Sequence, residues 1–308
     1  MRKKHSDLEL GVYLIFGGAW LIISGLRRFR RKRDVEDTST AKIRSAPQGS
    51  VEVQGYAWPF ESQEKNNLDG KECVFRNLVV LKKVNAGKRS SWIKVYEDHH
   101  ELPFLVFDQT GTVLVKPEGA DYEVRKVKYR WKDIHPKMQD VLKMKISTSG
   151  FPPSGGMFGP IFEFHEKYIL AGSPVYLRGN FSTPANRPRV NPAGGFVDFV
   201  TKVRSLTPES NFFKLLDGNG SGEISEEEAR FGFSTAAAIS LRQRTKLGTI
   251  GCAGIITSSL TTRLYIADCH QQYLLKRLKN WNFLRIVFGA ILVGAGVVMI
   301  LSDLKQHG

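Results

Sequence analysis

Oxygen-bearing residues alternate with glycine along one short segment in the C-terminal half of the chain. Side-chain oxygens at every second position, followed by a backbone carbonyl and a final glutamate, form the ligand pattern that a hard cation such as Ca²⁺ prefers. The candidate metal ligands are Asp217, Asn219, Ser221, Glu223 through its backbone carbonyl, Ser225 and Glu228. The spacing therefore predicts a calcium site that Glu228 closes as a bidentate ligand.

An ordinary loop is the alternative for the same residues. Ser225 and Glu228 have the spacing of a helix capping box, and runs of Asp, Gly, Asn and Ser are common in turns. A calcium loop of the EF-hand type is favoured because an oxygen stands at every ligand position and Gly222 stands at the sharp turn. Among the ligating side chains only Asp217 and Glu228 are charged, which predicts a dissociation constant between about micromolar and millimolar.

Helices are expected on both sides of this loop. Residues 207–209 resemble a helix start with proline in the first turn, and Ser225 begins the helix that leaves the loop. The helix-loop-helix would occupy residues 206–246. EF-hands usually pair through the apolar residue at the eighth loop position, here Ile224, and this one stands alone. We therefore expect Ile224 to pack either on the rest of the domain or on another subunit.

Two apolar segments predict membrane-spanning helices, one near each end of the sequence. Residues 10–26 carry no charge over about 25 Å of helix, which is close to the thickness of the hydrocarbon core. A cleaved signal peptide is the alternative, but the segment ends in the basic run RRFRRKR and no cleavage site of small residues follows. Residues 286–301 form the second segment, and its glycines could pack against the first span or against a second copy of the chain.

The net charge of +15 has an explanation at the membrane. Basic residues cluster at 27–33, directly after the first span, and again at 276–285, before the second. Basic loops tend to stay cytoplasmic, so we expect a cytoplasmic middle and outer tails in the plasma (inner) membrane, although residues 2–4 oppose this orientation. Anionic lipid headgroups are the expected partners of these charges, and nucleic acid is not needed to explain them.

A β-rich domain is expected between the spans, over residues 42–205. Short β-branched and aromatic runs separated by turn residues are typical of a small barrel or sandwich. The expected strands cover residues 51–56, 73–81, 92–96, 104–107, 113–115, 161–164 and 175–177. A helix is expected over residues 131–145, where apolar residues recur at helical spacing. The fold class is therefore α+β, with a β-rich domain and a single EF-hand between two transmembrane helices.

No arrangement of catalytic residues stands out. Cys73, Cys252 and Cys269 are far apart and form no CxxC pair, which excludes a cysteine-built metal module and favours buried free thiols. His99 and His100 have no carboxylate or cysteine partners at ligand spacing. Asp108 begins a turn-forming segment and is expected to be structural. We therefore expect a protein that is not an enzyme.

Two segments resemble a known family. PFLVFDQTGTVLVKPEGA (residues 103–120) is similar to the central signature of the GIDE domain, also called the beside-a-membrane domain, and HEKYILAGSPVYLRGNF (residues 165–181) is similar to its downstream motif. SAPQGSVEVQGYAWP and the GKECVFRNLVV stretch around Cys73 also fit, so the resemblance covers most of residues 42–205. It implies a β-rich module beside the bilayer, flanked by membrane helices.

The resemblance also implies an enzymatic alternative. Animal members of this family carry a RING finger and act as membrane-bound ubiquitin ligases. A RING needs about eight Cys or His ligands in paired spacing, and this chain's three cysteines and seven histidines do not form that pattern. The sequence thus favours a non-enzymatic calcium sensor or scaffold with an unidentified protein partner. The alternatives are a RING-less ligase relative and a protein that binds anionic lipid or nucleic acid through its basic patches.

Overall fold

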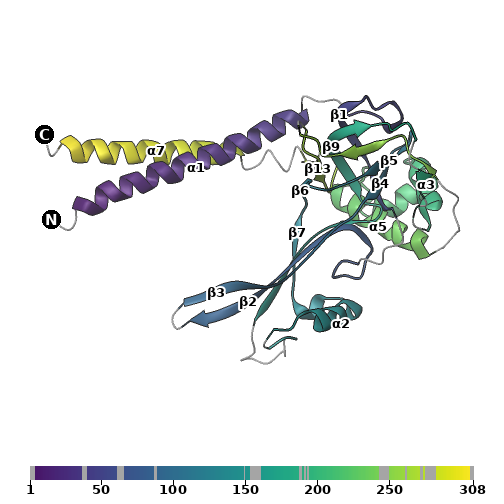
Figure 1. The fold of residues 1–308 in the computed structure, drawn as a ribbon, viewed down its shortest axis with the longest axis horizontal. Coiled ribbons are helices and arrows are strands. Elements are labelled where there is room, and N and C mark those ends of the chain that lie inside the picture. Colours follow the sequence, from purple (N-terminus) through teal and green to yellow (C-terminus); the bar gives the residue numbers. More distant parts are fainter. Residues whose placement is uncertain are drawn as a thin grey trace. The chain divides into compact units, whose positions relative to one another are not determined.

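The computed structural model divides the chain into two compact units. The terminal unit contains Met1–Ser39 and Gln271–Gly308, and the central unit contains Thr40–His270. Their elements are labelled in Figure 1. The structure describes residues 4–36, 40–60, 66–86, 89–148, 150–152, 161–186, 189–190, 192, 194–242, 250–260, 262–270, 273–274 and 282–305.

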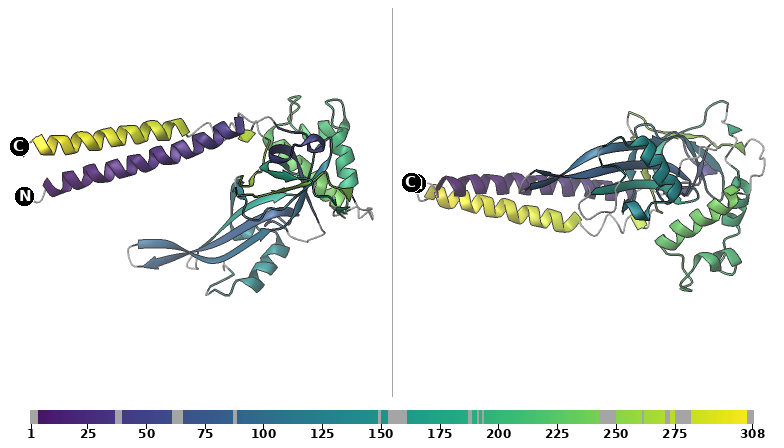
Figure 2. Two further views of the ribbon diagram at one scale, coloured as in Figure 1. Left: turned by 45° about the horizontal axis from the view of Figure 1, so that its top comes forward. Right: turned by 90° about the horizontal axis from the view of Figure 1, so that it is seen from below.

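The terminal unit is a pair of antiparallel helices, α1 (Lys4–Glu36) and α7 (Asn282–Lys305), which lie side by side in Figures 1 and 2. Glycines form the contact. A Cβ atom built on Gly18 would lie 2.6 Å from the carbonyl oxygen of Gly289, and one built on Gly296 would lie 2.7 Å from that of Gly11. Because these distances are too short for any real side chain, only glycine lets the two backbones approach this closely.

One described helix, α1, is long and apolar enough to cross a membrane by length and composition, over Leu10–Arg27 near the N-terminus. This stretch contains the first predicted span. The second predicted span is helical, and its apolar part, Ile286–Ser302, is shorter.

The central unit is built on a barrel-like sheet of seven strands, which we call the barrel sheet. Its strands are β1 (Gly49–Pro59), β4 (Phe104–Phe107), β5 (Thr112–Val115), β6 (Asp121–Glu123), β9 (Pro174–Ser182), β12 (Ile255–Thr257) and β13 (Tyr265–Ala267). The order β1-β4-β5-β12-β9 closes on itself because β9 also pairs with β1. β13 pairs with the other half of the same β9 edge and carries β6 beside it. The α+β class with a barrel-like sheet is thus confirmed.

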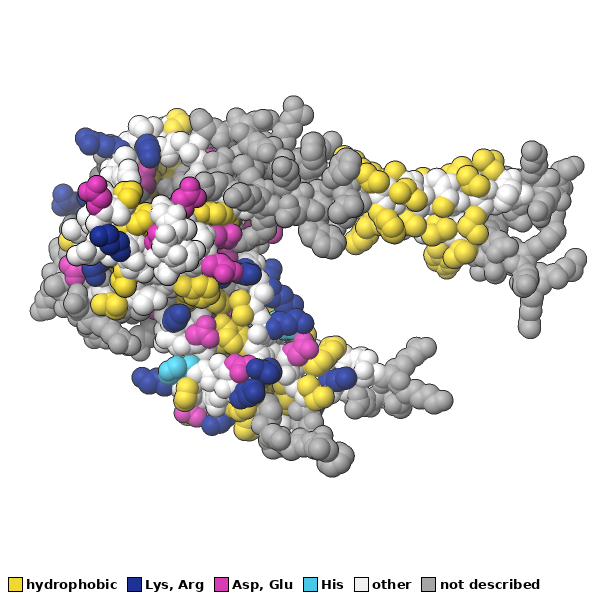
Figure 3. Space-filling model, turned by 180° about the vertical axis from the view of Figure 1, so that it is seen from behind, with side chains coloured by type: hydrophobic (Ala, Val, Ile, Leu, Met, Phe, Trp, Pro, Cys, Tyr) yellow, Lys and Arg dark blue, Asp and Glu magenta, His cyan; other side chains and the backbone are white. Residues whose placement is uncertain are grey.

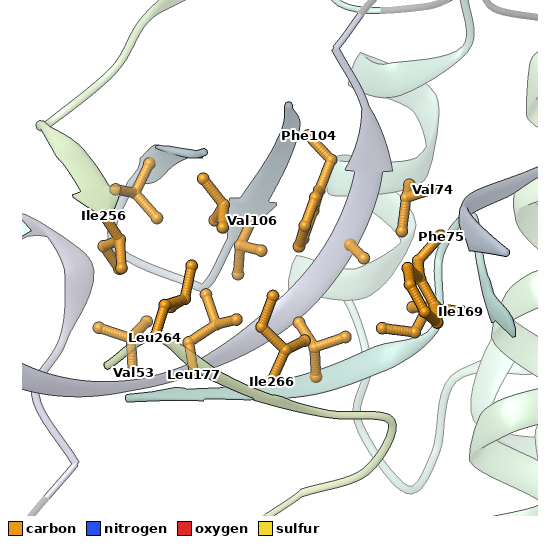
Figure 4. Close-up of a cluster of buried hydrophobic side chains, with 14 of the residues drawn as sticks. Val53, Val74, Phe75, Phe104, Val106, Ile169, Leu177, Ile256, Leu264 and Ile266 are labelled. Carbon is orange, nitrogen blue, oxygen red and sulfur yellow. The ribbon is translucent and has the colours of Figure 1, made fainter. Parts of the chain in front are cut away.

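The interior of the barrel sheet is apolar. Figure 4 shows side chains from β1, β4, β9, β12 and β13 turned toward one another. Phe104 and Val106 of β4 point into this core, while Leu105 and Phe107 pack on its outside against helices. A strand that is covered on both faces has no polar alternation, which explains the continuous apolar run that predicted a strand at these four residues.

A second sheet lies in the same unit. It has the order β3-β2-β8-β7 and is antiparallel throughout, and we call it the second sheet. Its strands are β2 (Cys73–Ala86), β3 (Arg89–Glu101), β7 (Lys126–Tyr129) and β8 (Phe162–Leu170). Helix α2 (Pro136–Lys145) packs on it through Met138 and Leu142. This helix begins later than predicted because the residue before a proline is disfavoured in helical conformation; a short turn, η2 (Trp131–Asp133), precedes it.

Three described helices lie between β9 and β12 in the chain and cover one side of the barrel sheet. They are α3 (Phe196–Arg204), α4 (Asn211–Leu216) and α5 (Glu226–Arg242). Phe199 and Phe233 of these helices pack on Trp58 and Phe107 in one buried cluster. The smaller elements are η1 (Ile43–Ser45) and the paired strands β10 (Arg189–Val190) and β11 (Ile250–Gly251). The barrel sheet therefore continues beyond residue 205, since β12 and β13 return to it after the helices.

Candidate metal site in the loop between α4 and α5

A short helix, α4, and a longer one, α5, hold the ends of the candidate calcium loop. The hydroxyl of Ser210 caps α4 by accepting the backbone N–H of Phe213 at 3.0 Å. This cap starts α4 at Asn211, after the Thr207 start that the sequence predicts. Beyond the loop, a Cβ atom on Gly232 would lie 2.3 Å from the end of the Leu216 side chain, so α5 packs closely against α4 at this point. The loop is therefore fixed at both ends.

The first half of the loop folds around the Asp217 carboxylate. One oxygen, Oδ1, accepts the backbone N–H of Ser221 at 2.9 Å, and the other accepts that of Gly222 at 2.8 Å. The side-chain oxygen of Asn219 accepts the Ser221 N–H as well, also at 2.9 Å. Gly222 has a φ of +76°, in the left-handed region that favours glycine. These bonds bring the first three candidate ligands to one side of the turn.

Glu228 closes the loop from the other side. Its Oε1 atom accepts the backbone N–H of Asn219 at 3.2 Å, and Oε2 accepts that of Ser225 at 2.9 Å. The hydrogen bonds from Ser225 are the main reason why the pKa of Glu228 lies below its usual value. The carboxylate is thus ionised at neutral pH and turned into the loop.

The remaining oxygens lie in the same turn. The Ser221 hydroxyl donates to the backbone carbonyl of Glu223 at 2.8 Å and lies 3.4 Å from Oδ1 of Asp217. The Ser225 hydroxyl accepts the backbone N–H of Glu228 at 3.3 Å. Ser225 and Glu228 therefore form the capping box that the sequence offers as the ordinary alternative, while the Glu228 carboxylate still faces Asn219.

The charge at this site is small. Among the described residues no group of three or more His, Cys, Asp and Glu side chains is placed to hold a metal ion. The loop contributes two carboxylates, from Asp217 and Glu228, and its other candidate ligands are amide, hydroxyl and backbone oxygens. Such a neutral-rich set suits Ca²⁺ and is a poor match for zinc, which prefers sulfur and nitrogen.

Ile224 connects the loop to the barrel sheet. It is half-buried and packs against the cluster that contains Phe107 of β4 and Phe233 of α5. Of the two expected positions for this residue, the structure shows packing on the domain. A loop residue between two candidate ligands thus touches the same apolar cluster as the outside of the barrel sheet.

Ion pairs link the first turns of α5 to the segment that connects the two sheets and to Asp268 beside it. Arg125 lies between β6 of the barrel sheet and β7 of the second sheet, and its guanidinium is 3.4 Å from Glu227. Arg230 is 3.3 Å from Asp268, which also accepts the Arg125 backbone N–H at 3.2 Å. The Arg230 guanidinium also lies 5.4 Å from the ring centre of Tyr168 on β8. Sequence reasoning missed these contacts because their members are far apart in the chain and no local pattern marks them.

The other polar residues that the sequence singles out have structural positions. Asp108 accepts the backbone N–H groups of Thr110 and Gly111 with one oxygen and that of Ile43 with the other, so it holds a turn. His99 is exposed on β3 and has a carboxylate neighbour that the sequence did not predict, since its Nε2 atom lies 3.2 Å from Glu101. The three cysteines are buried and form no disulfide, as expected.

Glu166 is a buried carboxylate on β8. Both of its oxygens accept the backbone N–H of Leu68, at 3.0 and 3.1 Å, and the nearest guanidinium, that of Arg76, is 4.0 Å away. Burial dominates over these favourable contacts and raises the pKa of Glu166 to about 8.

Comparisons with models of known protein families, with curated proteins and with solved structures found no match.

Proposed function

We propose that this protein is a membrane-anchored, calcium-binding module that acts as a non-enzymatic sensor or scaffold. The observation that carries the proposal is the arrangement of the loop between α4 and α5. Asp217, Asn219 and Ser221 share hydrogen bonds on one side, and the Glu228 carboxylate reaches back from α5 on the other. This arrangement supports the proposal because an EF-hand surrounds Ca²⁺ with oxygens from the first half of its loop and a glutamate from the helix that follows.

A bound cation would replace the weak hydrogen bonds within the loop with stronger bonds to its carboxylates. The loop is solvent-exposed, so its internal hydrogen bonds compete with water. A cation at its centre would be held by Asp217 and Glu228 together and would offset the repulsion between the two carboxylates. With only two charged ligands, we propose a dissociation constant between about micromolar and millimolar.

A route from the ion to the sheets supports a responsive role. Glu228 lies in the first turn of α5, next to Glu227 and two residues before Arg230. These two neighbours are bonded to Arg125 and Asp268 at the connection between the sheets. A ligand shifts a conformational equilibrium only through its unequal affinity for two states. We propose that the two states differ in the position of the first turn of α5.

Membrane anchoring is proposed through both helices of the terminal unit. Tyr13, Phe16 and Trp20 on α1 are 74%, 72% and 69% exposed, and Phe288 and Ile291 on α7 are 59% and 60% exposed. In Figure 3 the described surface of this unit is hydrophobic, with no charged side chain on the face shown. Such a surface suits lipid and not water. The short apolar part of α7, paired with α1 through glycines, would serve as the second span.

The orientation proposed for these spans leaves the central unit in the cytoplasm, because the basic residues at 27–33 directly follow the first span. We also propose that the barrel sheet is of the GIDE type. The two segments that carry the resemblance form β4, β5, most of β8 and nearly all of β9. Ubiquitin ligase activity is not part of the proposal, since the RING ligand pattern is missing from the sequence.

Calorimetric titration of calcium into the detergent-solubilised chain tests the proposal. We expect saturable binding that is lost in Glu228→Gln. Glu223→Gln is the matched control, because it removes the same charge from the same loop while leaving the Glu223 backbone carbonyl in place. We expect this control to bind within about tenfold of the wild type. The proposal fails if the wild type binds no calcium at millimolar concentration, or if both variants lose binding equally.

A further inference from the structure

The β2–β3 hairpin ends in a short two-stranded ribbon. Up to Lys82, β2 pairs with β8 on one side and β3 on the other; beyond Lys83, the described residues pair it with β3 alone. Figure 1 shows the two strands running out past the rest of the second sheet. Within the part of the chain that the structure describes, the end of this hairpin therefore lacks the covering helix and the additional strands that bury the residues nearer its base.

Each face of the hairpin end carries one apolar residue opposite one lysine. Trp92 is paired with Lys83, and Ile93 is paired with Lys82. Directly paired residues share a face of a sheet, and successive residues lie on opposite faces. Trp92 is 41% exposed and Ile93 is 46% exposed. The hairpin end is thus amphipathic on both faces, a pattern that a water-exposed ribbon does not need.

The charged residues within the hairpin end itself have a single sign. From Lys82 to Lys94 the sequence contains five basic residues and no acidic one. The five are Lys82, Lys83, Lys88, Arg89 and Lys94. The side chain of Lys94 is 57% exposed and pairs with Glu97. In Figure 3 the lobe that contains the second sheet shows basic and hydrophobic side chains with acidic ones among them, so the purely basic charge belongs to the hairpin end and not to the whole lobe. A partner must therefore offer negative charge and an apolar layer together.

We infer that the end of the β2–β3 hairpin docks on an anionic lipid surface. Tryptophan is enriched at the interface between lipid and water, and lysine stems can lie along apolar material while their ammonium groups reach headgroup phosphates. Nucleic acid would match the lysines but offers nothing to Ile93, whereas a bilayer interface matches both residue types. The inference depends on the proposed membrane anchoring only for bringing the hairpin near lipid.

An environment-sensitive fluorophore at the hairpin end tests the inference. Ser91 is exposed beside Trp92, so the full chain carrying Ser91→Cys is labelled and placed in nanodiscs of phosphatidylcholine, with or without phosphatidylserine. The unsubstituted chain serves as the labelling blank, because its cysteines are buried. Leu260→Cys, at a residue that is fully exposed elsewhere in the central unit, is the matched control position.

We expect a blue shift of the Ser91→Cys emission in the anionic discs, none in the neutral discs and none at Leu260→Cys. Replacing both Trp92 and Ile93 with serine should abolish it. Each of Lys82→Gln and Lys83→Gln should weaken docking by about fivefold, and high salt should weaken it further. Equal shifts in both lipids, no shift in either, or a shift produced by added RNA in neutral discs would overturn the inference. A chain that fails to enter discs contradicts the proposed anchoring instead.

Discussion

Arg230 on α5 lies 3.3 Å from Asp268, and the two side chains are only 5% and 1% exposed. Asp268 also holds the backbone N–H of Arg125, where the chain passes from β6 of the barrel sheet to β7 of the second sheet. One buried ion pair therefore joins the helix that leaves the candidate calcium loop to the connection between the sheets. A displacement of α5 at its loop end must be absorbed at this pair.

Removing the Arg230 guanidinium from this ion pair should destabilise the folded state. Arg230→Met is expected to lower the free energy of unfolding by about 3–5 kcal/mol, because the Asp268 carboxylate would stay buried without its guanidinium. Adding Asp268→Asn should recover part of the loss, since a neutral amide costs less to bury. Urea unfolding followed by circular dichroism measures both effects. Arg125→Met is the comparison, because its pair with Glu227 is exposed and should contribute less than about 1 kcal/mol.

The left-handed turn at Gly222 should set the calcium affinity. Gly222→Ala places a Cβ atom on a residue whose φ is +76°, at a cost of about 1–2 kcal/mol. We expect calcium binding to weaken by roughly five- to thirtyfold. Gly218→Ala is the matched variant in the same loop, since its Cβ atom would make an ordinary contact, 3.8 Å from Glu228. Calorimetry that gave equal affinities for the two variants would contradict this account of the loop.

The contact between α1 and α7 should depend on the glycines that face the partner helix and not on the number of glycines in each helix. Gly18→Leu and Gly289→Leu are expected to separate the helices, because each side chain would collide with the opposite backbone. Gly17→Leu and Gly294→Leu are the controls, since a Cβ atom at either position meets no atom within 4 Å. Spin labels at Leu10 and Leu301 report the separation in detergent. If glycines form the contact, the distance between the two spin labels should increase in Gly18→Leu and Gly289→Leu and stay unchanged in the two controls.

Glu166 should make the central unit less stable as the pH rises. Burial raises the pKa of its carboxyl from 4.5 to about 8, so the folded state holds a proton that the unfolded state releases between these values. The resulting stabilisation is complete below the lower value and is lost as the pH approaches the upper one. Glu166→Gln removes the titration while keeping an acceptor for the Leu68 N–H. The difference in urea midpoint between wild type and variant should therefore change in the variant's favour from pH 5 to pH 8.

Local patterns predict well the parts of this fold that local forces specify. The strand at 104–107 is predicted to the residue, because β4 is apolar on both faces and bounded by polar turns. The candidate ligands of the loop are adjacent in sequence, so their gathering at one turn follows from hydrogen bonds over a few residues. Glycine at position 222 could likewise be assigned to a left-handed turn.

Long-range pairing accounts for what the sequence does not predict. β12 and β13 are each only three residues long, and they are strands because β9 offers them an edge. β3 continues into the polar residues 97–101 for the same reason, since β2 pairs with it along that stretch. The ion pair between Arg230 and Asp268 arises from tertiary packing alone. These features depend on partners far along the chain, which a local pattern cannot identify.

The position of the helices between β9 and β12 determines the order in which the barrel sheet can form during protein synthesis. A ribosome delivers β9 first, and the strands that cover its second edge, β12 and β13, only after α3, α4 and α5. The candidate calcium loop is therefore complete in the nascent chain before the barrel sheet can close. A cation captured at that stage would act as an assembly aid, holding α5 in place while the last strands arrive.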